Sequence, residues 1–167
     1  MIQVYTGRGK GKTTASLGLA LRAAGAGLKV YIGQFVKGKY YSELRSLKKI
    51  KNIKIEQLGR RCFIKNPPTP KDILLARQGL EKIKKHILRR AYNLVILDEI
   101  NIALKLKLLK LDEVISLLKN TPEDLEIVLT GRYAHPEILK LADLVSDIKE
   151  VKHYFRKGVR ARKGIEF

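Results

Sequence analysis

The most constraining feature of this sequence is a segment rich in glycine and lysine between a predicted strand and a predicted helix. It spans residues 6–14 and consists of Thr6, Gly7, Arg8, Gly9, Lys10, Gly11, Lys12, Thr13 and Thr14. Glycines have no Cβ, so successive backbone N–H groups can wrap around an anion, and the helix N-terminus adds partial positive charge. We therefore expect these nine residues to form a phosphate-binding loop of the P-loop type.

Two side chains of this loop have expected roles. Lys12 should reach phosphate oxygens from a solvated loop, and the hydroxyl of Thr13 should bind Mg²⁺. The strict P-loop pattern requires glycine five residues before Gly11, and this chain has Thr6 there. The remaining glycines keep the backbone permissive, so the sequence still predicts a nucleotide site.

Strand-like and helical segments alternate along the chain, which predicts an α/β fold with a parallel sheet. We expect one domain over residues 1–167, with a RecA-like P-loop NTPase fold and about six strands flanked by helices. The predicted strands are Ile2–Thr6, Val30–Phe35, Ile53–Gln57, Leu94–Asp98, Ile127–Thr130 and Leu144–Asp147. The predicted helices are Thr13–Ala24, Ser42–Ile50, Lys71–Ala91, Leu111–Lys119 and His135–Ala142.

The helix predicted after Pro70 has the clearest pattern. Its apolar residues recur at spacings of three and four, so they form one stripe, and Thr69 should cap its N-terminus. The preceding stretch Gly59–Pro70 is long and irregular, which is typical of a lid or binding loop. The last eleven residues, Lys157–Phe167, are predicted to be an irregular basic tail.

A second acidic motif supports a metal-dependent nucleotide site. Four apolar residues at positions 94–97 precede Asp98 and Glu99. Carboxylates at the C-terminal end of a parallel strand lie where open α/β sheets bind ligands, and in P-loop proteins an acid here binds Mg²⁺. The alternative is an exposed pair that caps the next helix.

Composition limits the class of protein. The chain has 35 Lys and Arg against 16 Asp and Glu, a net charge of +19, but these residues are spread evenly, which favours a solvated surface over a nucleic-acid site. With one cysteine, Cys62, no intrachain disulfide can form, which fits a reducing compartment. No signal peptide or membrane-spanning segment is predicted, so we expect a cytoplasmic protein.

Further segments resemble one family in order along nearly the whole chain. That family is the P-loop-type corrinoid adenosyltransferases of cobalamin synthesis and salvage. Besides the P-loop and its helix, the matching segments are Gly27–Val30, Gln34–Gly38, Leu97–Ala103, Leu129–Arg132, Leu141–Asp143, Val151–His153, Phe155, Gly158 and Lys163–Phe167.

The resemblance implies transfer of the adenosyl group of ATP to Co(I) of a reduced corrinoid, with release of triphosphate. In this family the nucleotide lies across the P-loop in the reverse of the usual sense. The implied catalytic residues are Lys12, Glu99 and Arg132, which would act with Mg²⁺ on the triphosphate. Between the two acids, the resemblance favours Glu99 as the closer metal ligand over Asp98.

The resemblance also implies corrinoid contacts. Many members carry a Phe-x-Trp element after the third strand, whereas this chain has no tryptophan and offers Phe63 in that loop. His153 lies in the C-terminal signature and is the second candidate. We expect a homodimer without membrane or nucleic-acid partners, and a flavoprotein-type reductant is left open.

Two alternatives share the phosphate loop. A P-loop kinase or small NTPase would use the same loop and the same acids, but it needs an acceptor or catalytic water that no residue pattern indicates. A RecA-like nucleic-acid-binding protein would fit the net charge, but it needs a basic stripe interleaved with aromatics, for which Tyr40-Tyr41 and Tyr154-Phe155 are weak candidates.

Overall fold

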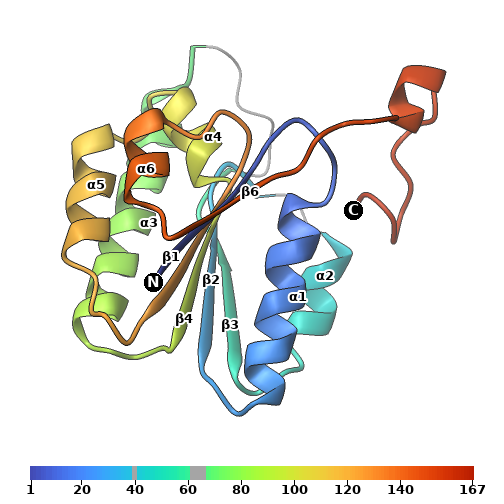
Figure 1. Ribbon diagram of the computed structural model, residues 1–167. Coiled ribbons are helices and arrows are strands. Elements are labelled where there is room, and N and C mark those ends of the chain that lie inside the picture. Colours follow the sequence, from blue (N-terminus) through green and yellow to red (C-terminus); the bar gives the residue numbers. More distant parts are fainter. Residues whose placement is uncertain (39–40, 61–66) are drawn as a thin grey trace.

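The computed structural model describes residues 1–38, 41–60 and 67–167. Six parallel strands form one sheet in the order β3-β2-β4-β5-β1-β6 (Figure 1). The strands are β1 (Ile2–Thr6), β2 (Val30–Gln34), β3 (Ile53–Gln57), β4 (Leu94–Asp98), β5 (Glu126–Thr130) and β6 (Leu144–Asp147). The α/β fold with a parallel sheet of six strands is confirmed.

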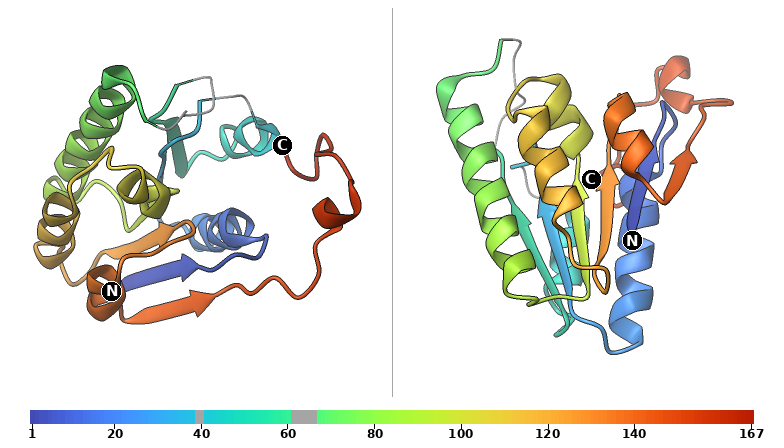
Figure 2. Two further views of the ribbon diagram at one scale, coloured as in Figure 1. Left: turned by 90° about the horizontal axis from the view of Figure 1, so that it is seen from above. Right: turned by 60° about the vertical axis from the view of Figure 1, so that its left-hand side comes forward.

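Helices cover both faces of this sheet, as Figures 1 and 2 show. One face carries α1 (Lys12–Gly25) and α2 (Ser42–Leu47). The other carries α3 (Pro70–Leu88), α4 (Ile100–Lys105), α5 (Leu111–Lys119) and α6 (Pro136–Leu141). A short 3₁₀ helix, η1 (Tyr154–Lys157), lies in the C-terminal segment. Among the described residues no helix combines the length and the apolar character needed to cross a bilayer.

The core consists of two apolar layers, because successive strand residues point to opposite faces. On β4, Val95 and Leu97 belong to the layer under α3, α4, α5 and α6, whereas Leu94 and Ile96 belong to the layer under α1 and α2. All five residues of β2 and of β4 are buried. The continuous apolar runs of these strands follow from burial on both faces.

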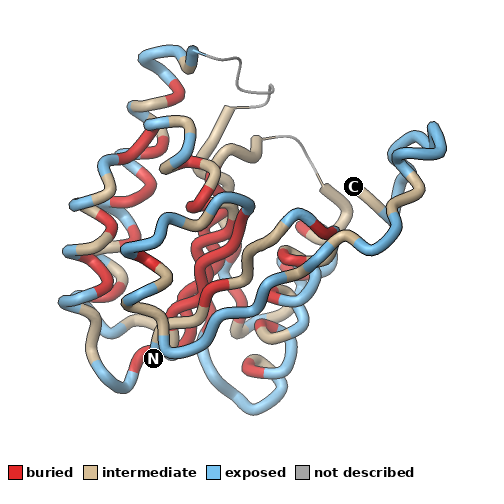
Figure 3. Tube along the Cα trace, turned by 45° about the horizontal axis from the view of Figure 1, so that its top comes forward, coloured by how far each residue is buried: buried red, intermediate tan, exposed pale blue. Residues whose placement is uncertain are grey.

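The edge strand β6 differs from the other strands. All four of its residues are exposed, including Leu144 and Val145, although its apolar start resembles a strand covered on both faces. Figure 3 shows this contrast, with buried central strands and an exposed path through β6 into the C-terminal segment. That segment then bends back, and its end lies near α2 (Figure 1).

Helix ends follow local sequence signals. Thr69 Oγ1 accepts a hydrogen bond from the Asp72 backbone N–H, and Asp72 Oδ2 accepts one from the Thr69 N–H, so a capping box precedes Pro70 as the cap at Thr69 predicted. The predicted ends of α2 and α3, Ile50 and Ala91, are too late by three residues each. The helix α4 was not predicted, because six residues carry too little periodicity.

Candidate active site

The segment predicted as a P-loop connects β1 to α1 at the carboxyl edge of the sheet. Thr6 ends β1, and its carbonyl accepts a hydrogen bond from the Ile148 N–H. Arg8, Lys10 and Thr14 are exposed. The nine predicted residues are therefore contiguous around one turn that opens onto the N-terminus of a helix of 14 residues.

Lys12 is buried, not solvated as the sequence suggested. Its side chain folds back over the loop, and Nζ donates to the carbonyls of Gly7 (2.8 Å) and Gly9 (2.6 Å). Burial, and then the positive charge of Arg132, lower the pKa of Lys12. The lysine is thus held inside the loop by two of the loop's own carbonyls. Its charge also interacts with that of Arg132.

Two glycines of the loop are required by the chain that passes beside it. A Cβ on Gly9 would lie 2.7 Å from the carbonyl oxygens of Ile148 and Lys149, and the Gly9 N–H donates to the Ile148 carbonyl at 2.7 Å, just after β6. Gly7 has φ 96°, and a Cβ there would overlap Asp147 Oδ1 and lie 2.5 Å from the Ile148 carbonyl oxygen. Gly11 has open space around it, so glycine is needed there for its backbone conformation (φ 121°) and not to avoid a clash. The open space leaves room for a ligand.

Asp98 is the centre of a buried hydrogen-bond network. Its Oδ1 accepts from the hydroxyls of Thr13 (2.9 Å) and Thr130 (2.7 Å). Its Oδ2 accepts from Gln34 Nε2 (3.0 Å) and from Lys37 Nζ (2.7 Å). The carboxylate therefore ties the P-loop to the carboxyl ends of β2, β4 and β5.

Glu99 lies beside this network and has a different setting. It follows β4 in a left-handed backbone conformation (φ 61°), and its N–H donates to Thr130 Oγ1 at 2.9 Å. Its side chain approaches Gly131, where a Cβ would lie 3.3 Å from Oε2. Burial and the neighbouring Asp98 charge raise the pKa of Glu99, against the opposing charges of Lys37, Lys12 and Arg132. Asp98 thus contacts the phosphate loop through Thr13, and Glu99 lies within electrostatic range of Lys12.

The oxygen atoms at this point fit Mg²⁺. The Thr13 hydroxyl and the Asp98 carboxylate already touch, and hard oxygen ligands with several retained waters are what Mg²⁺ prefers. Gln34 Oε1 is buried and has no hydrogen-bond partner in the described part of the chain, so it can accept from a metal-bound water. Within residues 1–38, 41–60 and 67–167, no cluster of three or more His, Cys, Asp and Glu forms a protein-only metal site.

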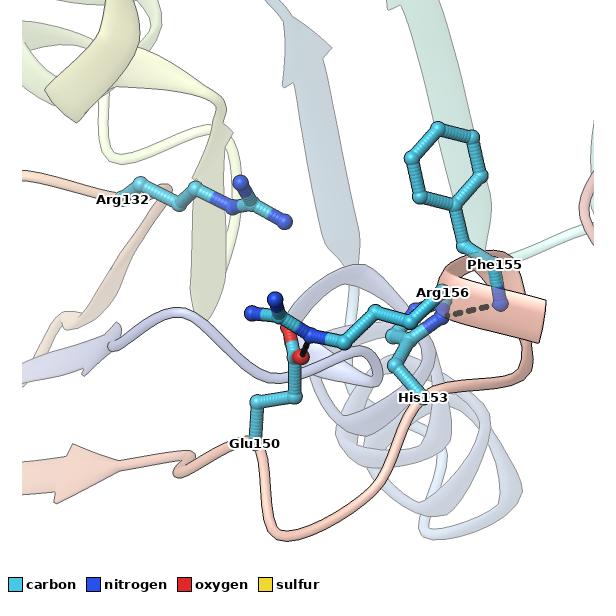
Figure 4. A pocket seen from close by; sticks show the side chains of 5 residues that line it. All are labelled: Arg132, Glu150, His153, Phe155 and Arg156. Atoms are coloured by element: carbon cyan, nitrogen blue, oxygen red, sulfur yellow. Dashed lines mark hydrogen bonds and ion pairs between the residues drawn. The ribbon is translucent and has the colours of Figure 1, made fainter. Parts of the chain in front are cut away.

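A cavity of about 530 Å³ lies next to the predicted catalytic arginine. It is lined by Arg132, Glu150, His153, Phe155 and Arg156 (Figure 4). Arg132 reaches toward it from the connection after β5, and the other four come from the segment after β6. Arg156 pairs with Glu150, and His153 Nδ1 accepts from the Phe155 N–H at 3.1 Å. His153 and Arg132 are therefore brought to one cavity, whereas Phe63 lies outside the described residues.

The C-terminal segment returns to the P-loop. Lys10 Nζ contacts the Tyr154 hydroxyl (2.5 Å), Glu166 Oε1 (2.7 Å) and the Ile165 carbonyl (3.3 Å). Arg162 also pairs with Glu166, and Ser42 donates to the Phe167 carbonyl at 3.0 Å. This tail, predicted to be irregular, has no helix or strand after η1 but contacts both the loop and α2.

Sequence reasoning gave no role in the adenosyltransferase site to Gln34, Lys37, Thr130, Tyr154 or Glu166. The signal was present for four of them, because Gln34 and Lys37 fall in the Gln34–Gly38 segment, Thr130 in Leu129–Arg132 and Glu166 in Lys163–Phe167, all of which carry the family resemblance. The strand order is what places Gln34, Lys37 and Thr130 around Asp98.

Comparison with solved structures supports the fold. A KaiC-like protein of the hyperthermophilic archaeon Pyrococcus horikoshii superposes with a TM-score of 0.57 at 17% identity, covering 87% of this chain and 70% of that one. At this identity the likeness concerns the fold alone, which is the RecA-like P-loop NTPase fold.

Comparison with known sequences identifies the family. The corrinoid adenosyltransferases of Escherichia coli K12 and of a Sinorhizobium species are 35% and 36% identical, over all of this chain and 85% and 80% of theirs. Corrinoid adenosyltransferase CobA of Salmonella typhimurium is 35% identical, over all of this chain and 85% of its own. The family model described as ATP:corrinoid adenosyltransferase BtuR/CobO/CobP matches residues 1–167. This chain therefore belongs to the family of ATP:corrinoid adenosyltransferases.

Proposed function

We propose that this enzyme transfers the 5′-deoxyadenosyl group of ATP to Co(I) of a reduced corrinoid and releases triphosphate. The proposal is supported above all by the contact between Thr13 of the P-loop and Asp98 at the end of β4, in a chain of this family. Cobalt supplies both electrons of the new Co–C5′ bond, so formally Co(I) becomes Co(III). The C5′–O bond breaks, and its electron pair leaves with triphosphate.

The protein's main task in this reaction is to stabilise the leaving group. Triphosphate is highly charged, and preorganised cations and N–H groups stabilise the negative charge that develops on the oxygen released from C5′. Lys12 would exchange its bonds to the Gly7 and Gly9 carbonyls for bonds to phosphate oxygens. Arg132, which lies near enough to lower the pKa of Lys12, would contribute a second cation.

A metal ion would complete this charge balance. We assign its binding to the Thr13 hydroxyl with Asp98 and Glu99, in direct contact or through water, and when bound it supplies a Lewis acid to the phosphates. Asp98 is the carboxylate that contacts Thr13, while Glu99 lies beside it with a pKa raised by burial and by the Asp98 charge. Neither carboxylate is needed as a base, because Co(I) is itself the nucleophile.

The corrinoid would bind at the cavity beside Arg132. His153 and Phe155 offer aromatic surface there, and Arg132 and Arg156 offer cations for its polar side chains. Phe63 remains a candidate for the lower face of the corrin. Expected assembly is a homodimer, which the exposed apolar start of the edge strand β6 would suit. A flavoprotein-type electron donor, if acidic, would be attracted by the net charge of +19.

The direct test is incubation with ATP, Mg²⁺ and chemically reduced cob(I)alamin. We expect a light-sensitive adenosylated product and one intact triphosphate per product. Release of orthophosphate without adenosylation would instead support the kinase or NTPase alternative. Tight binding of RNA or DNA that persists at raised salt would support the nucleic-acid alternative.

A further inference from the structure

Lys37 occupies an unusual position for a lysine. It follows β2, and its side chain is only 15% exposed. Its Nζ lies 2.7 Å from Asp98 Oδ2 and 3.3 Å from Thr13 Oγ1. The ammonium therefore lies between the P-loop hydroxyl and the strand-end carboxylate, the two oxygen groups that the proposed metal ion needs.

An ammonium and a divalent cation cannot both occupy this space. Each needs the same lone pairs on Asp98, and like charges a few ångströms apart repel strongly in a buried setting. The ammonium also neutralises a carboxylate that is fully buried and would otherwise be costly to keep charged. Lys37 thus satisfies the Asp98 carboxylate, but it must move when a metal ion binds.

Two neighbours fit such an exchange. Gln34 donates to Asp98 through Nε2, while its buried Oε1 has no partner within the described residues, so a metal-bound water can satisfy it. The Tyr41 ring centroid lies 5.5 Å from Lys37 Nζ, so an aromatic face is close to the ammonium when it leaves Asp98. The lysine stem is flexible and its three donors suit phosphate oxygens.

We propose that the Lys37 ammonium holds the cation position between Thr13 and Asp98 in the empty enzyme and exchanges it for a divalent metal ion, moving onto the triphosphate. This inference rests on the metal site of the proposed function. It gives Lys37 two successive roles, first as a substitute for the metal and then as a ligand of the leaving group. The exchange would prevent strong metal binding before the nucleotide arrives.

The first test measures metal binding without nucleotide. Mn²⁺ alone is titrated into the wild type and Lys37→Met, with free Mn²⁺ followed by electron paramagnetic resonance. We expect Lys37→Met to bind Mn²⁺ at least about tenfold more tightly, because the competing cation is gone. Lys140→Met, which removes an exposed lysine paired with Glu137 on α6, should match the wild type. An unchanged Mn²⁺ affinity in folded Lys37→Met overturns the proposal.

The second test needs no variant and so does not depend on how Lys37→Met folds. The wild type is acetylated briefly with and without millimolar Mn²⁺, and labelling is quantified at each lysine by mass spectrometry. We expect Mn²⁺ to increase labelling of Lys37 severalfold and to leave Lys140 unchanged. Equal labelling of Lys37 in both conditions contradicts displacement.

These outcomes are separable from the fate of the proposed function. Wild-type adenosylation of cob(I)alamin, together with an unchanged Mn²⁺ affinity in Lys37→Met, would remove only the exchange. A Mn²⁺ gain in Lys37→Met without any adenosylation by the wild type would remove only the proposed reaction. If both hold, Lys37→Met should also bind MgATP more weakly than the wild type, since it lacks a phosphate ligand.

Discussion

Thr13 and Asp98 lie 85 positions apart in the sequence, yet the threonine hydroxyl donates to the aspartate carboxylate at 2.9 Å. This bond joins the first turn of α1 to the end of β4. It brings a flexible glycine-rich loop against a carboxylate that is itself fixed by three further donors, from Gln34, Lys37 and Thr130. The two oxygen groups of the proposed metal site, Thr13 Oγ1 and the Asp98 carboxylate, are therefore held in place by the protein, with the Lys37 ammonium between them.

The two acidic residues should respond differently to loss of charge. Asp98→Asn places an amide among four donors in a buried network, so we expect a loss of about 3–5 kcal/mol in the free energy of unfolding along with loss of activity. Urea unfolding followed by circular dichroism measures the first effect. An Asp98→Asn protein as stable as the wild type would show that the network contributes little.

Glu99→Gln should separate activity from stability. We expect turnover to fall about 10–100-fold with a changed Mg²⁺ dependence. The folded-state pKa of Glu99 lies above its ordinary value, so its contribution to stability is full below the unfolded pKa, near 4.5, and is lost as pH rises through the folded value. Charged Glu99 therefore costs stability at neutral pH, and Glu99→Gln should melt higher than the wild type at pH 8, with the difference vanishing near pH 4.5. A lower melting temperature at pH 8 contradicts this.

Loss of the P-loop lysine should abolish function without unfolding the chain. Lys12→Ala removes the cation that would meet the triphosphate, and we expect turnover to fall about 10²–10³-fold. The loop should lose some order, because the Gly7 and Gly9 carbonyls lose their donor. Isothermal titration with MgATP checks binding, with Lys140→Ala as a matched exposed control. Near-normal turnover of folded Lys12→Ala would sink the P-loop assignment.

The tail contact at Lys10 should weaken nucleotide binding. The Glu166 carboxylate accepts from Lys10 Nζ, a donor that a phosphate oxygen could use. Its negative charge also repels an approaching triphosphate. We expect Glu166→Gln to lower the Kd for MgATP by no more than about fivefold, since the Lys10 side of the ion pair is exposed and screened by solvent. Glu137→Gln, which breaks the exposed pair with Lys140, should have no effect. Weaker ATP binding in Glu166→Gln would mean that the tail instead holds Lys10 in its working position.

A histidine far from the proposed site should make stability depend on pH. His86 packs against Tyr31 and Tyr92, with ring centroids 4.7 and 5.2 Å away, and burial followed by the Lys54 charge lowers its pKa. Its contribution to stability is therefore present above its ordinary pKa of 6.5 and is lost as pH falls through the lowered folded value. His86→Phe should flatten the decline in melting temperature between pH 7 and pH 5, seen by calorimetry.

An unchanged slope in His86→Phe would place the pH dependence elsewhere. His135→Asn serves as the control, because His135 lies on the exposed N-terminus of α6, where its ring accepts the Glu137 N–H.

The sequence predicted the bounds of strands and helices better than it predicted which side chains lie together in the fold. Strands such as Leu94–Asp98 were predicted to the residue, because a buried parallel strand is a continuous apolar run with a polar end. The burial of Lys12 was missed, because whether a loop lysine is solvated depends on which carbonyls turn toward it. The contact of Lys37 with Asp98 could not be predicted from hydrophobic periodicity either, because it depends on β2 lying next to β4 in the sheet. Sequence motifs indicated candidates for the site, while the strand order determines which of them meet.

The placement of β1 has a consequence for how the chain is made. This strand precedes both of its partners, β5 and β6, by more than a hundred residues, so Ile2 cannot pair until Ile127 has been made, nor Gln3 until Leu144 has been made. The P-loop can complete its contacts only later, because the Gly9 N–H donates to the Ile148 carbonyl. Pairings this distant form slowly and late. During synthesis the nascent chain thus carries a P-loop that lacks its neighbouring segment until Ile148 has been made.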